Sequence, residues 1–205
     1  MLSSYFQDRF TEAGCDEAGR GCLAGPVCAA AVILRRDFGH ELLNDSKQMT
    51  PEDRETLRVV IEQQAIAYAV AFVDNKTIDR INILQASFRA MHLAIRKLSL
   101  RPQLLLVDGN RFIPFRGIPH ECIIQGDAQY ASIAAASVLA KTYRDAYMVR
   151  LHQKYPVYCW NENKGYPTEK HRSGLREFGS TSYHRLSFRL LPEDGTVTDP
   201  QALED

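Results

Sequence analysis

The chain has 205 residues, of which 45% are hydrophobic, and its 25 basic and 25 acidic residues give a formal net charge of zero. This length and composition suffice for one sizeable hydrophobic core and exclude a chain that is mainly disordered. No run of eighteen uncharged apolar residues is present and no apolar signal region follows the first residues, so we expect a cytoplasmic protein without a membrane span.

The zero net charge hides a segregation of charge along the chain. Residues 141–189 contain ten Lys or Arg against four acids, a net charge of +6, whereas residues 191–205 carry five acids and no base. A basic segment of this kind either faces phosphate groups or forms an ordinary solubilising surface. The acidic end has the composition of a solvated tail.

The five cysteines are odd in number, include no C-x-x-C pair and lie mainly in apolar surroundings. They are Cys15, Cys22, Cys28, Cys122 and Cys159. We therefore expect reduced core residues and not a zinc site.

The first half of the chain alternates predicted strands and helices. Apolar runs of strand length cover 27–34 and 65–73. Between them, Thr50 offers an N-cap and Pro51 a proline at the first helical position, which predicts the start of a helix. Apolar residues recur at spacings of three and four over 84–98, which predicts a helix that packs on the sheet.

The second half begins with two shorter apolar runs, at 104–107 and 122–124, which we also interpret as strands. The alanine-rich stretch 130–151 is composed of strong helix formers and predicts a long helix. Within the basic region we expect loops and one short helix over 171–178.

Four acids are placed where such a fold positions ligands. Asp108 ends the run 104–107, so its carboxylate should lie at the carboxyl end of a strand. Asp127 precedes the long helix by a few residues, near an N-terminus that favours anions. Asp16 and Glu17 follow a possible first strand and precede a glycine-rich turn.

Gathering these acids is costly. Two like charges about 4 Å apart repel by roughly 4 kcal/mol at an effective dielectric near 20, so such a cluster points to a bound cation. The alternative for each acid alone is a helix cap or a turn former. Adjacent side chains of a strand face opposite ways, so Asp16 and Glu17 reach one site only if the chain bends between them, which Gly19 and Gly21 could permit.

The turn Gly19-Arg20-Gly21 has two interpretations. It matches the loose G-x-G-x-x-A pattern of dinucleotide-binding turns, but that pattern requires a following helix, and Gly25-Pro26 with the strand-like run 27–34 follows instead. The preferred interpretation is that the glycines allow close approach to a sugar-phosphate chain, with Arg20 available for a phosphate.

Taken together, these segments resemble the bacterial ribonuclease HII family, of the type 2 ribonuclease H group, over roughly residues 12–189. The motifs that carry the resemblance follow one another along most of the chain. They are Asp16-Glu17-Ala18-Gly19-Arg20-Gly21, Asp45-Ser46-Lys47, Val107-Asp108-Gly109, Gly126-Asp127, the stretch 133–141, Lys164-Gly165-Tyr166-Pro167-Thr168 and His184-Arg185-Leu186-Ser187-Phe188.

The resemblance implies an α/β, ribonuclease H-like fold, with a mixed central β-sheet flanked by α-helices, as one catalytic domain over residues 1–190. A C-terminal helical portion, about 141–190, should close over the substrate. Residues 191–205 should form an acidic, flexible tail. Monomer is the expectation that follows from the family.

The resemblance also implies the chemistry. The family holds two divalent ions, Mn²⁺ or Mg²⁺, around the scissile phosphate, one activating a water and the other stabilising the departing 3′ oxygen, which leaves a 5′-phosphate and a 3′-hydroxyl. Its four catalytic acids correspond to Asp16, Glu17, Asp108 and Asp127.

Substrate recognition is implied in the same way. In the family, the turn equivalent to Gly19, Arg20 and Gly21 contacts the 2′-hydroxyl that distinguishes RNA from DNA. The tyrosine equivalent to Tyr166 packs against the next sugar and favours an RNA-to-DNA junction. The alternative for Tyr166 is an ordinary core or surface aromatic.

Several cations are candidate phosphate contacts, and each is equally well explained as a surface group or ion-pair partner. Such contacts would make binding fall with salt without reading base identity. Lys47 and Lys164 rank first; the others are Lys141, Arg144, His171 and Arg185.

These inferences predict an endoribonuclease that nicks the RNA strand of RNA–DNA hybrids and cuts on the 5′ side of a ribonucleotide embedded in duplex DNA. One alternative is another metal nuclease of the same fold, such as an exonuclease, against which Gly19-Arg20-Gly21 and Tyr166 argue. The other is a hybrid-binding module without chemistry, which four intact acids disfavour.

Overall fold

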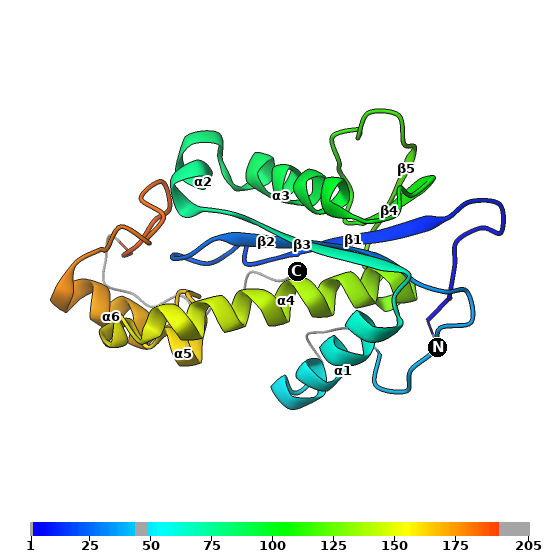
Figure 1. Ribbon diagram of the computed structural model, residues 1–205. Coiled ribbons are helices and arrows are strands. Elements are labelled where there is room, and N and C mark those ends of the chain that lie inside the picture. Colours follow the sequence, from blue (N-terminus) through cyan, green and yellow to red (C-terminus); the bar gives the residue numbers. More distant parts are fainter. Residues whose placement is uncertain (1, 44–48, 193–205) are drawn as a thin grey trace.

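The computed structural model describes residues 2–43 and 49–192 and contains a mixed five-stranded sheet in the order β3-β2-β1-β4-β5 (Figure 1). Strand β1 pairs antiparallel with β2 and parallel with β4, while β2–β3 is antiparallel and β4–β5 parallel. The strands are β1 (Glu12–Ala18), β2 (Val27–Ile33), β3 (Ala67–Val73), β4 (Leu104–Asp108) and β5 (His120–Ile123).

Helices cover both faces of this sheet. Figure 1 shows α2 and α3 on one face, and α4 with α1 on the other. The helices are α1 (Pro51–Gln64), α2 (Asn75–Ile81), α3 (Ile83–Lys97), α4 (Ala131–His152), α5 (Trp160–Asn163) and α6 (Glu169–Phe178), with short 3₁₀ turns η1 (Gly126–Ala128) and η2 (Pro156–Tyr158).

Strand β2 lies between the two layers, so it is apolar along its whole length. Ala29 and Ala31 belong to the core under α3, whereas Ala30 and Val32 belong to the core shared with α1 and α4. This period-two division explains why the sequence shows a continuous apolar run and no alternation.

Gly14 permits helix α4 to lie directly on β1. A Cβ atom at this position would stand 2.1 Å from the carbonyl carbon of Ser132 and 2.3 Å from the amide nitrogen of Ile133. The backbone of the helix start therefore touches the backbone of β1, and this contact fixes the height of α4 over the strand that carries Asp16.

The predicted elements are present with small shifts of their ends. Thr50 caps α1 by accepting a hydrogen bond from the Asp53 amide at 3.1 Å. The strand expected over 65–73 begins two residues later, because Ala65 is the C-cap of α1. The fifth strand likewise covers His120–Ile123 and not 122–124.

Three features differ from the sequence-based expectations. Asp16 and Glu17 lie inside β1 and do not follow it. Helix α2 was not expected, although Asp74 caps it by accepting from the Thr77 amide at 2.7 Å. The basic region holds α5 and η2 in addition to the expected helix, which is α6.

The C-terminal elements pack at the far end of α4, around a small core of their own. Trp160 and Tyr158 stack there with ring centroids 5.0 Å apart, together with Leu175 of α6 and Met148 of α4. In Figure 1, α5 and α6 accordingly lie beside the last turns of α4.

Two further expectations concern cysteines and membranes. All five cysteines are free; Cys15, Cys22 and Cys28 are buried, while Cys122 and Cys159 are partly exposed, so only three are core residues. Over residues 2–43 and 49–192, no helix combines the length and the apolar character that crossing a membrane requires.

Candidate active site

The register of β1 and β4 brings two of the predicted acids side by side. The last paired residues of these parallel strands are Cys15 and Val107. Asp16 and Asp108 come next on their strands, at the carboxyl edge of the sheet where α/β folds place ligands. Asp16 is only 6% exposed.

Asp127 is brought close through its neighbour in the chain. The Gly126 amide donates to Asp108 Oδ1 at 2.7 Å, so the turn η1 that carries Asp127 adjoins the end of β4. Gln125 precedes it in a left-handed conformation with φ 54°, which turns the chain sharply after β5.

The acids strongly influence one another's ionisation. Burial raises the pKa of Asp16 well above its usual range, and the charges of Glu17 and Asp108 raise it further, although a hydrogen bond from Ser137 of α4 acts the other way. Burial raises the pKa of Glu17 to about 7; Arg20 lowers this pKa and Asp108 raises it. The three carboxylates therefore share one electrostatic environment.

Glu17 also has a cation beside it. Arg20 Nη1 lies 3.2 Å from Glu17 Oε1, with Arg20 55% exposed and Glu17 only 9% exposed. The Glu17 amide donates to Asp16 Oδ1 at 2.6 Å, which ties the two acids together within the strand. Asp16 and Glu17 therefore interact electrostatically although both lie within β1.

The donor chemistry of this group suits magnesium or manganese, which prefer carboxylate oxygens. As they stand, no three His, Cys, Asp or Glu side chains within the described part of the chain are near enough together to hold a metal ion. The carboxylates therefore suit a divalent ion by the type of their ligand atoms and by the influence of their charges on one another. They would have to move closer together to coordinate the ion.

The glycine-rich turn after β1 is held in place by hydrogen bonds from the Arg185 side chain. This side chain is fully buried and donates to the carbonyls of Gly25, Arg20 and Gly19 at 3.0, 2.8 and 2.7 Å. The expectation that Arg185 contacts phosphate directly is corrected by this geometry, because its guanidinium is enclosed by protein carbonyls. Burial lowers its pKa to about 10, which still leaves it charged at neutral pH.

Arg144 of α4 joins the same turn to a second loop. It is fully buried and donates to the carbonyls of Pro26, Lys164 and Ala24 at 3.0, 2.8 and 3.2 Å. Gly19 has φ +93°, and a Cβ atom there would lie 1.8 Å from Arg144 Nε. Arg144 is therefore also a structural support and not a phosphate contact.

Tyr166 lies on this second loop, against the turn. Its loop is fastened by the Leu23 amide, which donates to the Gly165 carbonyl at 2.8 Å. The Tyr166 hydroxyl is hydrogen-bonded to Cys22, and burial raises its pKa, so the phenol stays protonated. Lys141 Nζ lies 5.4 Å from the ring centroid, within cation–π range.

The remaining predicted cations have different settings. Lys164 is partly buried, donates to the Asn161 carbonyl, and has its pKa lowered by that burial. His171 is fully buried and bonded to Trp160 and His184, so it cannot reach a phosphate. Lys47 lies outside the described residues.

Sequence reasoning missed the residues that anchor the segment after α6. Asn75 donates to the carbonyls of Ser182 and His184, at 2.9 Å each. Asp79 accepts from the Leu186 and Ser187 amides at 3.0 Å. Both anchors lie on α2, and their partners are more than a hundred residues away, so no local pattern could reveal them.

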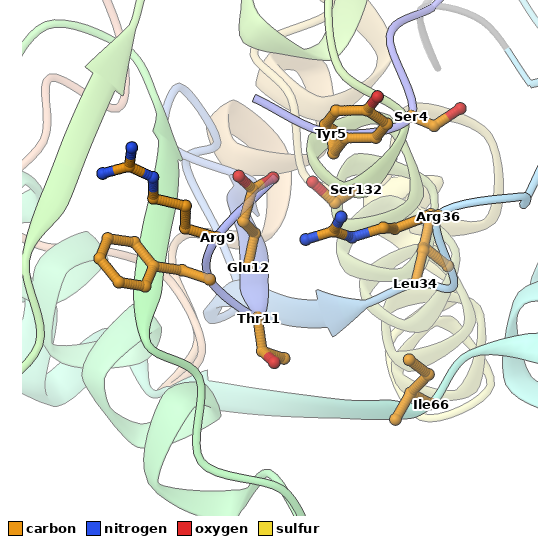
Figure 2. Close-up of a pocket in the computed structure, with 10 residues that line it drawn as sticks. Ser4, Tyr5, Arg9, Thr11, Glu12, Leu34, Arg36, Ile66 and Ser132 are labelled. Carbon is orange, nitrogen blue, oxygen red and sulfur yellow. The ribbon is translucent and has the colours of Figure 1, made fainter. Parts of the chain in front are cut away.

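A separate pocket of about 160 Å³ lies at the opposite, amino-terminal end of β1 (Figure 2). Its lining includes Glu12, Arg36 and Ser132 but none of the predicted site residues. Glu12 accepts from the Phe6 and Gln7 amides at 2.8 Å, so its carboxylate fastens the N-terminal segment. This pocket is not part of the acidic site.

A mixed sheet between helical layers, with carboxylates at the ends of its two central parallel strands, defines an α/β protein of the ribonuclease H-like class. The sequence model of the family described as ribonuclease HII matches residues 13–191. The chain belongs to the ribonuclease HII family. It is accordingly a ribonuclease H, an endonuclease that acts on RNA–DNA hybrids.

Individual relatives agree with this assignment. A ribonuclease HII of Bacteroides thetaiotaomicron is 62% identical over 191 residues, which cover 93% of this chain and 96% of that protein. The crystal structure of ribonuclease H2 from Pyrococcus horikoshii OT3 has a TM-score of 0.71 and 27% identity, covering 87% and 94% of the two chains. Bst-RNase HIII in complex with Mn²⁺ shares the fold, with a TM-score of 0.67 and 19% identity, covering 86% and 66%.

Proposed function

We propose that this ribonuclease H nicks the RNA strand of RNA–DNA hybrids and also cuts 5′ to single ribonucleotides embedded in duplex DNA, as a step in their removal. The proposal rests on one observation, namely that a group of interacting acids lies next to the glycine-rich turn. The acids Asp16, Glu17 and Asp108 share one electrostatic environment, and the turn Gly19-Arg20-Gly21 directly follows β1, the strand that carries Asp16 and Glu17.

The acids are proposed to hold two divalent ions, Mn²⁺ or Mg²⁺, with Asp127 as the fourth ligand. When bound, such ions supply an activated water and stabilise the departing 3′ oxygen, leaving 5′-phosphate and 3′-hydroxyl ends. The chain's own contribution is to fix Asp16 by burial and by Ser137, and Asp108 by the Gly126 amide.

Selection of ribonucleotides is proposed to come from the turn and from Tyr166. Arg185 and Arg144 take up five carbonyls between residues 19 and 26, so the backbone of this loop is held rigidly. A rigid loop whose residues 19 and 21 lack side chains can place backbone groups against a 2′-hydroxyl. Tyr166, fastened beside it, would pack on the adjoining sugar.

Other parts of the proposal rest on the family resemblance. We propose a cytoplasmic monomer with one catalytic domain over residues 1–190, whose portion 141–190 closes over the substrate. Lys164 is retained as a phosphate contact, and so is Lys47. The acidic tail expected over 191–205 lies almost wholly outside the described residues.

One assay tests the central claim. A duplex DNA with a single ribonucleotide, labelled at the 5′ end of the ribonucleotide strand and blocked at its ends, is incubated with Mn²⁺, with Mg²⁺ or with a chelator. We expect one cut, on the 5′ side of the ribonucleotide, only with a metal ion. Equal cutting of an all-DNA duplex would contradict recognition of the 2′-hydroxyl, and dependence on a free end would favour an exonuclease.

A further inference from the structure

A second concentration of positive charge lies outside the site described above. Residues 89–120 contain six Lys or Arg and a single acid, Asp108. The six cations are all exposed; they are Arg89, Arg96, Lys97, Arg101, Arg111 and Arg116. The asymmetry is concealed by the zero net charge of the whole chain.

The loop between β4 and β5 carries part of this charge and is held firmly against α3 (Figure 1). The His92 ring of α3 lies 5.1 Å from the Phe112 ring and 5.2 Å from the Phe115 ring. His92 Nε2 is also 2.8 Å from the Ile113 carbonyl oxygen. The loop therefore presents its arginines from a fixed position.

Two guanidinium groups contact the end of this loop, and a third arginine belongs to the loop itself. The Arg96 guanidinium lies 6.0 Å from the Phe115 ring centroid, and Arg101 Nη2 is 3.4 Å from the Gly117 carbonyl oxygen. Arg116 stands between these two contact points in the chain. We call Arg96, Arg101 and Arg116 the arginine surface.

This surface lacks internal neutralisation. None of the ion pairs found among the described residues includes any of its three arginines. Arginines gathered from a helix, a linker and a loop without a carboxylate repel one another, and an external polyanion relieves that repulsion.

The arginine surface lies beside the amino-terminal ends of β4 and β5, whereas Asp108 lies at the carboxyl end of β4. The loop starts directly after Asp108, and strand register places Ile123 opposite Asp108 and His120 opposite Leu105. Arg101 precedes Asp108 by seven residues, so it lies up to roughly 23 Å from that carboxylate along β4. That separation corresponds to up to about seven base steps of a duplex, at 3.4 Å each.

We propose that the arginine surface is a second contact for the nucleic-acid duplex, which binds the phosphates on one flank of the cut site. The inference rests on the proposed function, since it takes the substrate duplex as its partner. Sheet order gives the arrangement: the glycine turn lies on the β2 side of the acids and the arginine surface on the β5 side. Binding there is electrostatic and independent of base sequence.

The test uses two duplexes of about 20 base pairs, each with one ribonucleotide, placed four base pairs from either the upstream or the downstream end. Binding is measured by fluorescence anisotropy in a chelator, over a series of salt concentrations. For the variant Arg96→Gln/Arg101→Gln/Arg116→Gln we expect about tenfold or greater loss of affinity for only one of the two duplexes. The slope of log K against log salt should fall by about 2 to 3 for that duplex, since each lost phosphate contact removes about 0.9.

Two variants serve as controls. Arg96→Lys/Arg101→Lys/Arg116→Lys keeps the charge and should keep most of the affinity. Arg9→Gln/Arg35→Gln/Arg36→Gln removes equal charge elsewhere and should leave the difference between duplexes unchanged; Arg9 and Arg36 line the pocket of Figure 2. Thermal melting confirms that each variant is folded.

The outcomes separate the two proposals. Equal affinity of the Gln variant and the wild type for both duplexes would overturn the arginine surface, and so would an equal loss for both. Failure of the wild-type protein to cut either duplex with metal present would contradict the proposed function instead.

Discussion

Glu17 forms an ion pair with Arg20 in which only one partner is exposed to solvent. Arg20 is 55% exposed and Glu17 is 9% exposed, so the guanidinium can move away into solvent while the carboxylate stays in place. A divalent cation carries twice the charge and would enter beside Asp108, so it can displace the guanidinium from Glu17. Release of Arg20 would then leave it available to the substrate backbone.

Substitution of Asp108 tests whether this residue is a metal ligand. Asp108→Asn removes the charge with little change of size and keeps an oxygen able to accept from the Gly126 amide, so the fold should be retained. We expect kcat to fall by more than the roughly 10–100-fold that loss of an outer-shell metal partner costs. The rate of cutting a single-ribonucleotide duplex in Mn²⁺ measures this.

Asp37→Asn is the matched control, since Asp37 is 78% exposed and pairs with the exposed Arg35. It should cut at the wild-type rate. Full activity of Asp108→Asn, with an unchanged melting temperature, would show that Asp108 is not a metal ligand.

At the scale of elements, local signals were enough to predict most strands and helices. The Thr50 cap and the stripe over 84–98 depend on residues within one or two turns, which is why α1 and α3 were found. Helix α2 was missed because seven residues are too short for a periodic stripe. The motifs predicted the acids and the turn as site residues, but they did not reveal the side chains that hold the turn in place.

Arg185 shows why those supports could not be predicted. Its hydrogen bond to Gly19 spans 166 residues, and the choice between a phosphate and a carbonyl as partner depends on burial. In the sequence it is one more cation in a basic segment. Only the packing of the C-terminal segment on the turn after β1 shows that it faces inward.

Arg185→Lys should therefore loosen the turn while keeping the charge. An ammonium group cannot reproduce the guanidinium fork, so at least one carbonyl loses its donor, at roughly 1–3 kcal/mol. We expect a lower free energy of unfolding and a smaller ratio of cutting between ribonucleotide and all-DNA duplexes. Urea unfolding and paired cleavage assays measure the two effects.

Arg176→Lys is the control for this exchange, because Arg176 forms an exposed pair with Glu169 on α6. It should change neither quantity. If Arg185→Lys lowered stability yet left the cutting ratio intact, Arg185 would support the fold without positioning the turn.

The contact between β1 and α4 gives a second prediction at this scale. Gly14→Ala places a methyl group 2.1 Å from the Ser132 backbone, where nothing flexible can yield. Overpacking of this kind costs roughly 1–3 kcal/mol or more. We expect a lower urea midpoint and a lower kcat, since lifting α4 also separates Ser137 from Asp16. Gly39→Ala, with no atom near its added Cβ, should be neutral.

At the scale of the whole molecule, a buried aromatic and histidine cluster holds the C-terminal portion to the core. The hydrogen bonds fix one neutral tautomer for each histidine. His171 Nε2 accepts from Trp160 Nε1 at 3.0 Å, so His171 carries its proton on Nδ1, 2.9 Å from the Tyr166 carbonyl oxygen. His184 Nδ1 accepts from the Thr181 amide at 2.8 Å, which leaves its Nε2 to donate to His171 at 3.1 Å.

An additional proton on either ring would break this network. Burial lowers the pKa of His171, and burial together with His171 lowers the pKa of His184 to about 4. The His184 backbone is bonded to Asn75 of α2 and bridged to Ala24, so the cluster is coupled to the loop that carries the glycine turn. Protonation of His171 or His184 would therefore weaken the attachment of the C-terminal portion both to α2 and to the loop that carries the glycine turn.

The pH dependence of stability follows with a definite sign. Because the folded pKa of His184 lies below the unfolded value of about 6.5, its contribution is present above pH 6.5 and is lost as the pH falls towards 4. A shift of this size corresponds to roughly 3 kcal/mol when complete.

Urea unfolding between pH 7 and pH 4 measures this effect. The free energy of unfolding should fall less for His184→Gln than for the wild type over this range, although the variant is less stable at pH 7. His40→Gln, which alters a histidine outside the cluster, should follow the wild-type slope, and an equal decline in all three proteins would contradict the assignment to His184.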